Sequence, residues 1–461
     1  GQANTDYGYS YTDWYGAYKG VMQNKFRKAD GTFDYGAVEE LNANNENGSI
    51  MVMTKAKNYH NWYGLVSTYN TKLTKDIDFY GGVDFRFYKG THTNDIVDLY
   101  GGKYFIDSTR KSVKPENNAN AANQSWVYQK LGVGDAVYRD YDGHVVQEGA
   151  FFQAEYSKNG LSSFLSGSLS NTSYWRYDRL YYDKKNAESE TKNYLGFTVK
   201  GGANYNFNEH HNAFFNVGYI SRAPKFNYGA FLSFASSNVT NPDAKNEKVV
   251  SFELGYGYRL KWLQVDVNAY WTKWLDKTMA KSSTVGTAQV DAFVNMTGVN
   301  ALHKGIEIEA KASPLYWLDV NAMFSIGDWK WDSNAKGYVF DYNGQPLTKD
   351  GSIASGIGAE DHLSTGINLK GIHVGGAAQT TAALGATIKI GKEIRIGADW
   401  TLYARNYAYY SISGSNLSLG KTNTVADPWR VPTASQFDLN ASYKFKIAGL
   451  NATISGNVNN L

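Results

Sequence analysis

One pattern recurs along most of the chain. A run of ten to sixteen residues alternates apolar side chains with polar ones or glycine, a tight turn and a second such run follow, and a long polar loop comes next. In one clear example Ile77, Phe79 and Val83 share one parity, and Asp78 and Tyr80 share the other. Successive side chains of an extended strand point to opposite faces, so each run has one apolar and one polar face. The length of the runs, with short turns at one end and long loops at the other, is typical of a transmembrane antiparallel β-barrel.

The composition favours the same interpretation. The 461 residues contain no apolar run near the roughly 18 residues that a membrane-spanning helix needs, so the chain is either water-soluble or a barrel. The 36 tyrosines and 12 tryptophans favour the barrel, because such rings suit a membrane–water interface. Cysteine is absent, which excludes disulfides and thiolate metal sites. A net charge of +3, from 46 basic and 43 acidic residues, gives no reason to expect a nucleic-acid partner.

The parity of each run predicts an all-β fold with about fifteen strands. These strands cover residues 7–24, 59–73, 77–92, 147–158, 161–176, 192–207, 212–222, 248–260, 262–276, 302–312, 317–330, 373–390, 393–407, 434–446 and 450–460. Short turns join them in pairs: Asn159-Gly160 is a strong hairpin signal, and Ser313-Pro314 is another expected turn.

The segments between the strand pairs are expected to be extracellular loops. They cover residues 25–58, 93–146, 177–191, 223–247, 277–301, 331–372 and 408–433. Loops of this length would count against a compact soluble domain. Because bacterial single-chain barrels have an even number of strands and fifteen is odd, we expect further chain to close the barrel.

Four consecutive blocks of the chain resemble the barrel of TonB-dependent outer-membrane receptors. They are NAFFNVGYISRAPKF (212–226), NPDAKNEKVVSFELGYGYRL (241–260), NMTGVNALHKGIEIEA (295–310) and LNATISGNVNNL (450–461). The resemblance implies a 22-stranded barrel filled by an N-terminal plug domain. It also implies that residues 1–461 are part of one transmembrane β-barrel domain, and that the plug and the closing strand are not in this chain.

Aromatic side chains of the expected loops and strand ends are the first candidates for ligand binding. They are Trp126, Tyr128, Trp175, Tyr177, Trp329, Trp331, Tyr338, Tyr342, Tyr407 and Tyr409. Such rings can stack on a sugar, a peptide or a conjugated ring system. The alternative for each ring is a place in the interfacial belt or in the packing of one loop against another.

Charged residues on the polar parity are expected to face the lumen. They are Arg86, Lys200, Arg222, Glu253, Glu307, Arg395 and Arg405. Such a wall can hold a polar plug, and its simplest role is solvation of the lumen and cross-strand pairing. The sequence displays no nucleophile motif and no metal-spaced histidine set, so we expect no enzyme activity, no metal and no cofactor.

By the resemblance, the chain is part of an active transporter in the outer membrane of a Gram-negative bacterium, surrounded by membrane lipids. Such a receptor imports a scarce nutrient (a siderophore, glycan, peptide or cofactor) with energy from the TonB complex, which acts through the missing plug. The many loop aromatics and few loop histidines favour a glycan or a peptide, and a surface lipoprotein is a further candidate partner in the glycan-importing, SusC-like branch. A passive porin, or less favourably an integral outer-membrane hydrolase, is the alternative.

Overall fold

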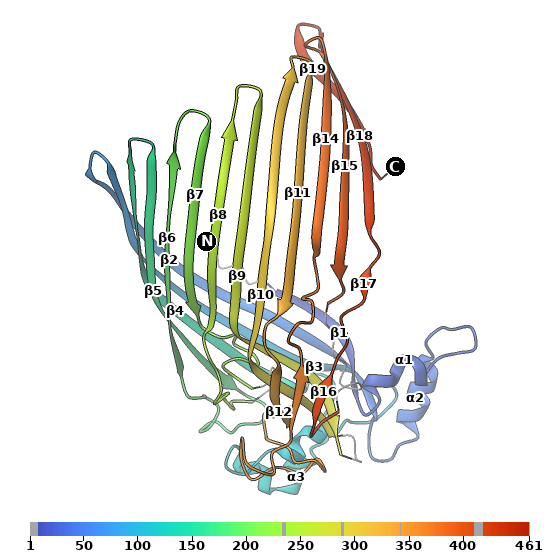
Figure 1. Cartoon of the computed structure of the whole chain (residues 1–461). Coiled ribbons are helices and arrows are strands. Elements are labelled where there is room, and N and C mark those ends of the chain that lie inside the picture. The colour runs from blue at the N-terminus through green and yellow to red at the C-terminus, as the bar shows by residue number, and fades with distance from the viewer. Residues whose placement is uncertain (1–7, 233–236, 287–289, 342, 410–417, 461) are drawn as a thin grey trace.

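The computed structural model shows one curved sheet whose long strands run antiparallel to their neighbours in chain order (Figure 1). It describes residues 8–232, 237–286, 290–341, 343–409 and 418–460. The long strands are β1 (Gly8–Gly16), β2 (Met51–Thr74), β3 (Ile77–Asp98), β4 (Ala136–Lys158), β5 (Leu161–Asp178), β6 (Lys192–Asn206), β7 (His211–Arg222), β8 (Glu247–Arg259), β9 (Leu263–Val285), β10 (Val290–Leu315), β11 (Leu318–Trp331), β14 (Ala378–Ile390), β15 (Ile394–Tyr407), β18 (Ala434–Ile447) and β19 (Leu450–Val458).

The remaining elements are short and lie in the loops. The strands are β12 (Ala335–Asp341), β13 (Ser364–Asn368), β16 (Thr422–Thr424) and β17 (Arg430–Val431), and β13 pairs with β16 in parallel. The helices are α1 (Met22–Lys25), α2 (Tyr35–Ala43) and α3 (Gln124–Val127), with 3-10 turns η1 (Lys19–Val21), η2 (Ser108–Ser112) and η3 (Ala119–Ala122). In the part of the chain that the structure describes, no helix is both long and apolar enough to cross a bilayer.

The fifteen long strands correspond to the fifteen predicted ones, and with the four short loop strands the described residues form nineteen strands. The boundaries differ most at the loop end of the sheet. β2 begins at Met51 and β4 at Ala136, within segments that we expected to be loops, whereas β1 ends at Gly16, well before the predicted residue 24. Several residues at the start of β2, including Met51, Val52 and Ala56, are buried. Because these strand ends pack against loops, the apolar–polar alternation that identified the strands is lost there.

Two predicted turns had opposite outcomes. The hairpin at Asn159-Gly160 is confirmed, with positive φ of 53° at Asn159 and 80° at Gly160, as a tight two-residue turn requires. The prediction of a turn at Ser313-Pro314 is wrong, because β10 continues to Leu315 and β11 starts at Leu318. The register is irregular between Ala312 and Leu315. A proline, which cannot donate to the ladder, is tolerated at such an irregular strand end.

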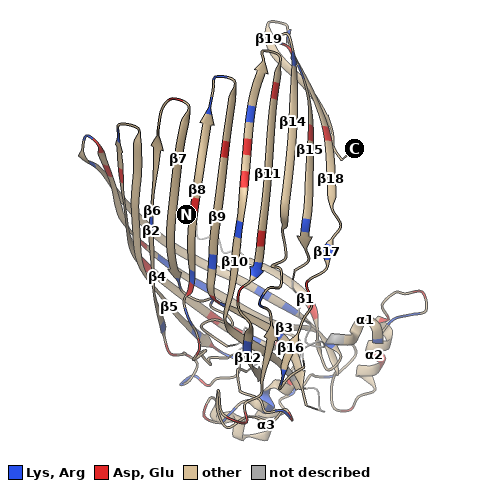
Figure 2. Cartoon of the chain, in the orientation of Figure 1, with Lys and Arg blue, Asp and Glu red and all other residues tan. Residues whose placement is uncertain are grey.

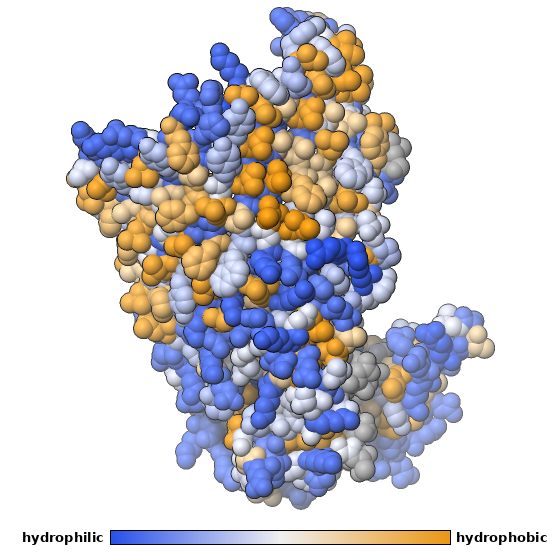
Figure 3. Space-filling model, viewed as in Figure 1, coloured by the Kyte–Doolittle hydropathy of each residue, from blue (hydrophilic) through white to orange (hydrophobic). Residues whose placement is uncertain are grey.

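The two faces of the sheet differ in hydropathy along the strands. Phe252 is 51% exposed, Leu254 64% and Leu439 40%, so these side chains lie on an outer surface and outside any core. Figure 3 shows an apolar band over the upper part of this surface, with a hydrophilic zone beneath it. A continuous exposed apolar surface marks contact with lipid or another molecule.

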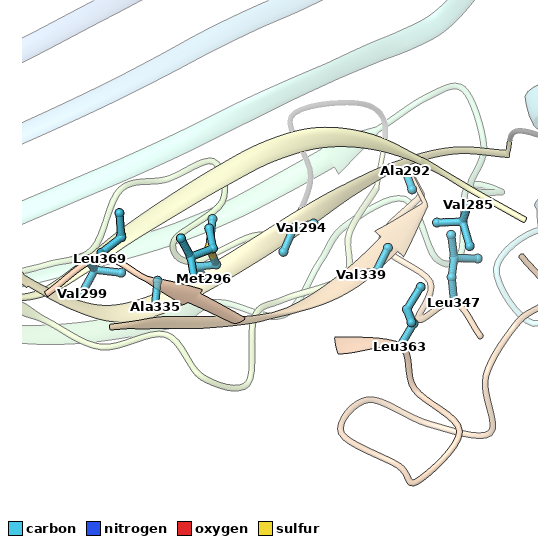
Figure 4. Close-up of a cluster of buried hydrophobic side chains, with 11 residues drawn as sticks. Val285, Ala292, Val294, Met296, Val299, Ala335, Val339, Leu347, Leu363 and Leu369 are labelled. Carbon is cyan, nitrogen blue, oxygen red and sulfur yellow. The ribbon is translucent and has the colours of Figure 1, made fainter. Parts of the chain in front are cut away.

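The buried cores of the molecule lie at its loop end. The largest cluster joins β9, β10, β12, β13 and the loop residues before and after β13. It contains Val285, Ala292, Val294, Met296, Val299, Ala335, Val339, Leu347, Leu363, Ile367 and Leu369 (Figure 4). A second cluster packs α1, α2 and the start of β2 around Met22, Phe26, Val38 and Met51. The Asp34 carboxylate caps α2 by accepting a hydrogen bond from the Ala37 backbone N–H (3.1 Å). The loops are therefore folded structures that pack with one another.

Candidate functional site

The polar face of the sheet contains a hollow of about 660 Å³ between β5 and β11. Polar and aromatic side chains line this hollow, which we call the wall hollow: Lys200, Asn216, Glu253, Asn268, Tyr270, His303, Glu307 and Trp329, together with Phe164 and Thr272. It brings together three of the charged residues expected to face the lumen and one of the aromatic candidates. His303 and Tyr270 are lining residues that sequence reasoning missed, although both share the polar parity of their strands.

The register of the strands brings these residues together. Glu253 of β8 lies directly opposite Asn216 of β7 and Tyr270 of β9, and Glu307 of β10 lies opposite Asn268. Side chains that lie directly opposite in a sheet share a face and touch. Gly305 gives the Tyr270 ring its space, since a Cβ at this position would lie 2.6 Å from the tyrosine hydroxyl.

Hydrogen bonds hold several lining side chains of the hollow in place, whereas two charged ones form no ion pair among the described residues. The Asn216 and Asn268 amides donate to the two oxygens of Glu253, at 3.0 and 2.6 Å. The Trp329 indole N–H donates to the Tyr270 hydroxyl at 2.9 Å. Neither Lys200 nor Glu307 forms an ion pair with a residue that the structure describes. Lys200 on β6 and Glu307 on β10 lie four strands apart, so one positive and one negative group flank the fixed rings at separate ends of the hollow. Each can contact a different part of a polar molecule that lies along the wall.

The other charged residues expected in the wall lie outside this hollow. Arg222 donates to Glu247 (2.6 Å), whose side chain is 2% exposed, and its guanidinium lies 5.6 Å from the Trp274 ring. Arg405 has a positive φ of 52° and donates to the carbonyl oxygen of Gly327 (2.8 Å). Arg86 lies 3.8 Å from Asp84 on β3, and Arg395 lies on β15 opposite Lys389 and Ser442.

Three of the aromatic candidates stack on histidines. Trp175 lies parallel to His144 (ring centroids 4.8 Å apart), Tyr338 to His362 (4.7 Å) and Tyr407 to His373 (4.1 Å). Trp175 lies on β5 opposite His144, and His144 lies opposite Lys89, two residues from the apolar Phe87. These two rings therefore lie on the outer face of the sheet. The alternative of packing or an interfacial belt describes these rings better than ligand contact.

The remaining aromatic candidates are dispersed. The Arg110 guanidinium lies 4.9 Å from the Trp126 ring and the Lys111 ammonium 5.1 Å from the Tyr128 ring, both in one loop. Trp331 packs against the largest loop core, and the backbone of Tyr177 forms an isolated antiparallel β-bridge with Glu188. Tyr409 is 82% exposed, and Tyr342 lies outside the described residues. Trp331 lies two residues from Trp329 on the same face of β11, and of these two rings Trp329 lines the wall hollow.

Contacts between distant loops close the loop end of the molecule. Arg176, fully buried, donates to the Ser237 carbonyl oxygen (2.6 Å) and to Asn227 (2.5 Å). The Tyr181 hydroxyl donates to Asp107 (2.8 Å), and burial raises the pKa of Tyr181 well above its ordinary value. The sequence carried no signal for these residues, because their partners lie 50 or more positions away.

Asp341 organises one of these contacts. Its carboxylate accepts hydrogen bonds from the backbone N–H groups of Asn343 (2.9 Å) and Gln345 (2.7 Å). This turn then joins two other loops, since Gln345 donates to the Ser112 carbonyl oxygen (2.5 Å) and the Ser237 hydroxyl donates to the Asn343 carbonyl oxygen (2.5 Å). Burial raises the pKa of Asp341 from 3.8 to about 6, against the lowering effect of the N–H donors.

Asp341→Asn is expected to stabilise this turn at neutral pH. Because the pKa of Asp341 is higher in the folded chain, its ionisation costs stability, from almost nothing below pH 3.8 to about 3 kcal/mol above pH 6. Asparagine keeps an acceptor oxygen for the N–H groups and carries no charge. Amide exchange of Asn343, Gly344, Gln345 and Leu347, corrected for the intrinsic rate, should slow in the variant at about pH 8 and should match the native protein near pH 4. Equal protection at the higher pH would contradict the expectation.

The sequence matches a family model described as "TonB dependent receptor-like, beta-barrel" over residues 1–461. The chain belongs to this family. In the region that the structure describes, no group of three or more His, Asp or Glu residues is arranged to hold a metal ion. Two observations show that this receptor barrel is an all-β protein: the family match and the sheet itself.

Solved structures of similar fold are receptors and transporters. The copper transporter OprC superposes with a TM-score of 0.56 at 13% identity, over 89% of this chain and 52% of that one. The unliganded ferric citrate transporter FecA gives 0.54 at 11% identity, over 88% and 50%. BauA, the ferric preacinetobactin receptor from Acinetobacter baumannii, gives 0.50 at 11%, over 89% and 51%. The receptor barrel thus spans about half the length of the structures it matches, and no curated protein matches its sequence.

Proposed function

We propose that the protein imports a scarce nutrient across the outer membrane of a Gram-negative bacterium with energy from the TonB complex. The observation that carries the proposal is the family match over the whole chain. The apolar outer surface is consistent with a barrel wall in lipid, since strands whose outer faces are apolar and inner faces polar are what a membrane barrel requires. Receptors and transporters are also the solved structures of similar fold.

The same proposal gives the wall hollow a role. Residues 1–461 form part of one barrel domain, and a plug domain outside this chain lies against the polar wall and reaches TonB. The hollow is then a gap between plug and wall that a solute passes. Lys200 and Glu307 are placed to contact the solute, since neither is tied to a neighbouring charge among the described residues.

The chemistry of the hollow favours a small polar solute over a strongly anionic one. Its charged residues are Lys200, Glu253 and Glu307, so negative charge exceeds positive charge by one at neutral pH. Trp329 and Tyr270 line the hollow together with the amides of Asn216 and Asn268. Rings for stacking and planar polar groups for hydroxyls or peptide bonds fit a glycan or a peptide.

Deletion of the gene is expected to abolish growth on one nutrient of a panel that contains haem, ferric citrate, cyanocobalamin, maltodextrin and dipeptides, each supplied at limiting concentration. Deletion of tonB should abolish growth on the same nutrient, because a plugged barrel has no open path. Growth that continues without TonB would contradict the proposal and favour the function of a passive porin.

Variants of the wall distinguish transport through the hollow from transport elsewhere. Glu307→Gln removes a charged acceptor in the hollow and is expected to raise the half-saturating nutrient concentration about tenfold, which corresponds to the loss of one charge-assisted hydrogen bond. The matched control is Glu309→Gln, two residues along the same face of β10 and outside the hollow, which should transport normally.

A further inference from the structure

The outer surface changes from apolar to charged at one row of side chains on β9, β10 and β11. Ile306 and Ile308 of β10 and Ile326 of β11 are exposed at 47%, 37% and 42%. The next outward position on β10 is Lys304, and Lys273 and Lys330 occupy the same zone on the neighbouring strands. Figure 3 shows hydrophilic surface directly below the apolar band, and Figure 2 shows Lys and Arg on these strands toward the loops.

The register groups these three lysines. Leu302 lies directly opposite both Lys273 of β9 and Lys330 of β11, and Lys304 lies two residues further along the same face of β10. Adjacent strands lie about 4.8 Å apart and alternate residues about 6.6 Å apart, so the three Cα atoms form a small triangle. The long lysine stems allow three ammonium groups to reach one point. We call Lys273, Lys304 and Lys330 the lysine rim.

The lysine rim carries an excess of positive charge. Lys273 pairs with Asp332 (2.6 Å), and Lys330 pairs with Asp328 (3.0 Å). Lys304 lies 3.9 Å from Asp328, which Lys330 already engages more closely, and its side chain is 54% exposed. Among the ion pairs of the described residues, these three lysines share two carboxylates, and Lys304 is the least neutralised of the three. His373, which lies opposite Lys330, pairs with a third carboxylate, that of Asp427 (2.9 Å).

We propose that the lysine rim binds a phosphate group of an anionic lipid in the outer leaflet, with Lys304 as the main contact. The inference rests on the proposed outer-membrane location. The rim lies where a headgroup would lie, at the loop-side border of the apolar band, and Trp271, directly opposite Lys304, marks the interface. Acyl chains of the same lipid would cover Ile306 and Ile326, so one molecule satisfies both the charge and the apolar surface below it.

A neighbouring pair provides a matched control. Lys248 of β8 lies directly opposite Leu275 of β9, two residues from Lys273, and so shares its outward face. Lys248 pairs with Asp276 at 2.7 Å, and no second cation among the described residues pairs with this carboxylate. A general effect of surface charge on lipid binding would act through Lys248 as strongly as through Lys304.

The test is native mass spectrometry of the detergent-purified protein with added lipid A. The native protein should bind bisphosphorylated lipid A at least fivefold more tightly than fully dephosphorylated lipid A. Lys304→Gln should weaken binding of the phosphorylated form about fivefold, since one lysine near an anionic surface contributes about that factor. Lys273→Gln and Lys330→Gln, whose ammonium groups are already paired, should each weaken it less, and the triple variant K273Q/K304Q/K330Q should weaken it more than Lys304→Gln alone. Lys248→Gln should bind as the native protein does.

Three outcomes would overturn the proposal: equal binding of dephosphorylated lipid A, an equal loss in Lys248→Gln, or competition by millimolar inorganic phosphate, which would indicate a free-anion site. Heat-modifiable migration on gels confirms that each variant is folded. Nutrient uptake in cells is measured separately, so that the two proposals can fail independently. A lysine variant that loses lipid binding but keeps TonB-dependent uptake would support the lipid site. Uptake by the native protein that does not depend on TonB, with lipid binding intact, would reject only the proposed transport function.

Discussion

Ile308→Arg is expected to remove most of the protein from the outer membrane, whereas Glu309→Arg leaves its amount unchanged. The two residues are adjacent on β10 and lie on opposite faces of the sheet. Ile308 lies near the middle of the apolar band, between the charged row at Lys304 and the turn after Leu315. An arginine facing lipid at the bilayer midplane costs about 2–4 kcal/mol, and one facing the lumen costs little.

The measurement is the folded fraction in outer-membrane preparations, scored by heat-modifiable migration. The same residue, arginine, is introduced at neighbouring positions on the two faces. Net charge rises by one in Ile308→Arg and by two in Glu309→Arg, so an effect of net charge alone would be the larger in Glu309→Arg. A normal folded fraction for Ile308→Arg would show that this face does not contact hydrocarbon. Loss of both variants would mean that β10 tolerates arginine on neither face and would leave no distinction between lumen and lipid.

The long strands could be predicted because their signal is local. Alternate residues of a strand lie on the same face and meet the same surroundings, so Phe252 and Leu254 mark the apolar face without knowledge of any partner. The hairpin at Asn159-Gly160 depends only on two residues with positive φ. Where a strand end packs against loops, as at Met51 in β2, this constraint ends and so does the prediction.

The loop end could not be predicted because its contacts join distant parts of the chain. Gln345 meets Ser112 across 233 positions, and neither residue belongs to a pattern. The aromatic candidates illustrate the same limit, since composition indicated rings in the loops but not that Tyr338 and Tyr407 would stack on histidines. Trp329 differs because it lies on a regular strand, where parity alone places it on the polar face, directly opposite His303.

Arg176→Met is expected to release the loop of residues 223–246 from the sheet. The guanidinium is fully buried, donates two hydrogen bonds to this loop, and lies 4.5 Å from the Tyr141 ring and 4.7 Å from the Phe231 ring. Methionine fills similar volume but leaves the Ser237 carbonyl and the Asn227 amide oxygen without this donor. Loss of two charged hydrogen bonds and the cation–π contacts should cost about 3–6 kcal/mol of local stability.

Protease digestion of intact cells measures this release, because the proposed orientation places the loop on the cell surface. Cleavage within the described part of the loop should rise by two orders of magnitude or more, since about 3 kcal/mol corresponds to a factor of more than 100 in the open population. Arg179→Met is the matched control. Arg179 is partly exposed and binds Asp140 and Asp142, and Asp142 keeps Lys89 at 2.9 Å, so a loss of about 1 kcal/mol or less is expected. Equal cleavage of the two variants would mean that the surrounding apolar cluster, and not the buried guanidinium, holds the loop in place.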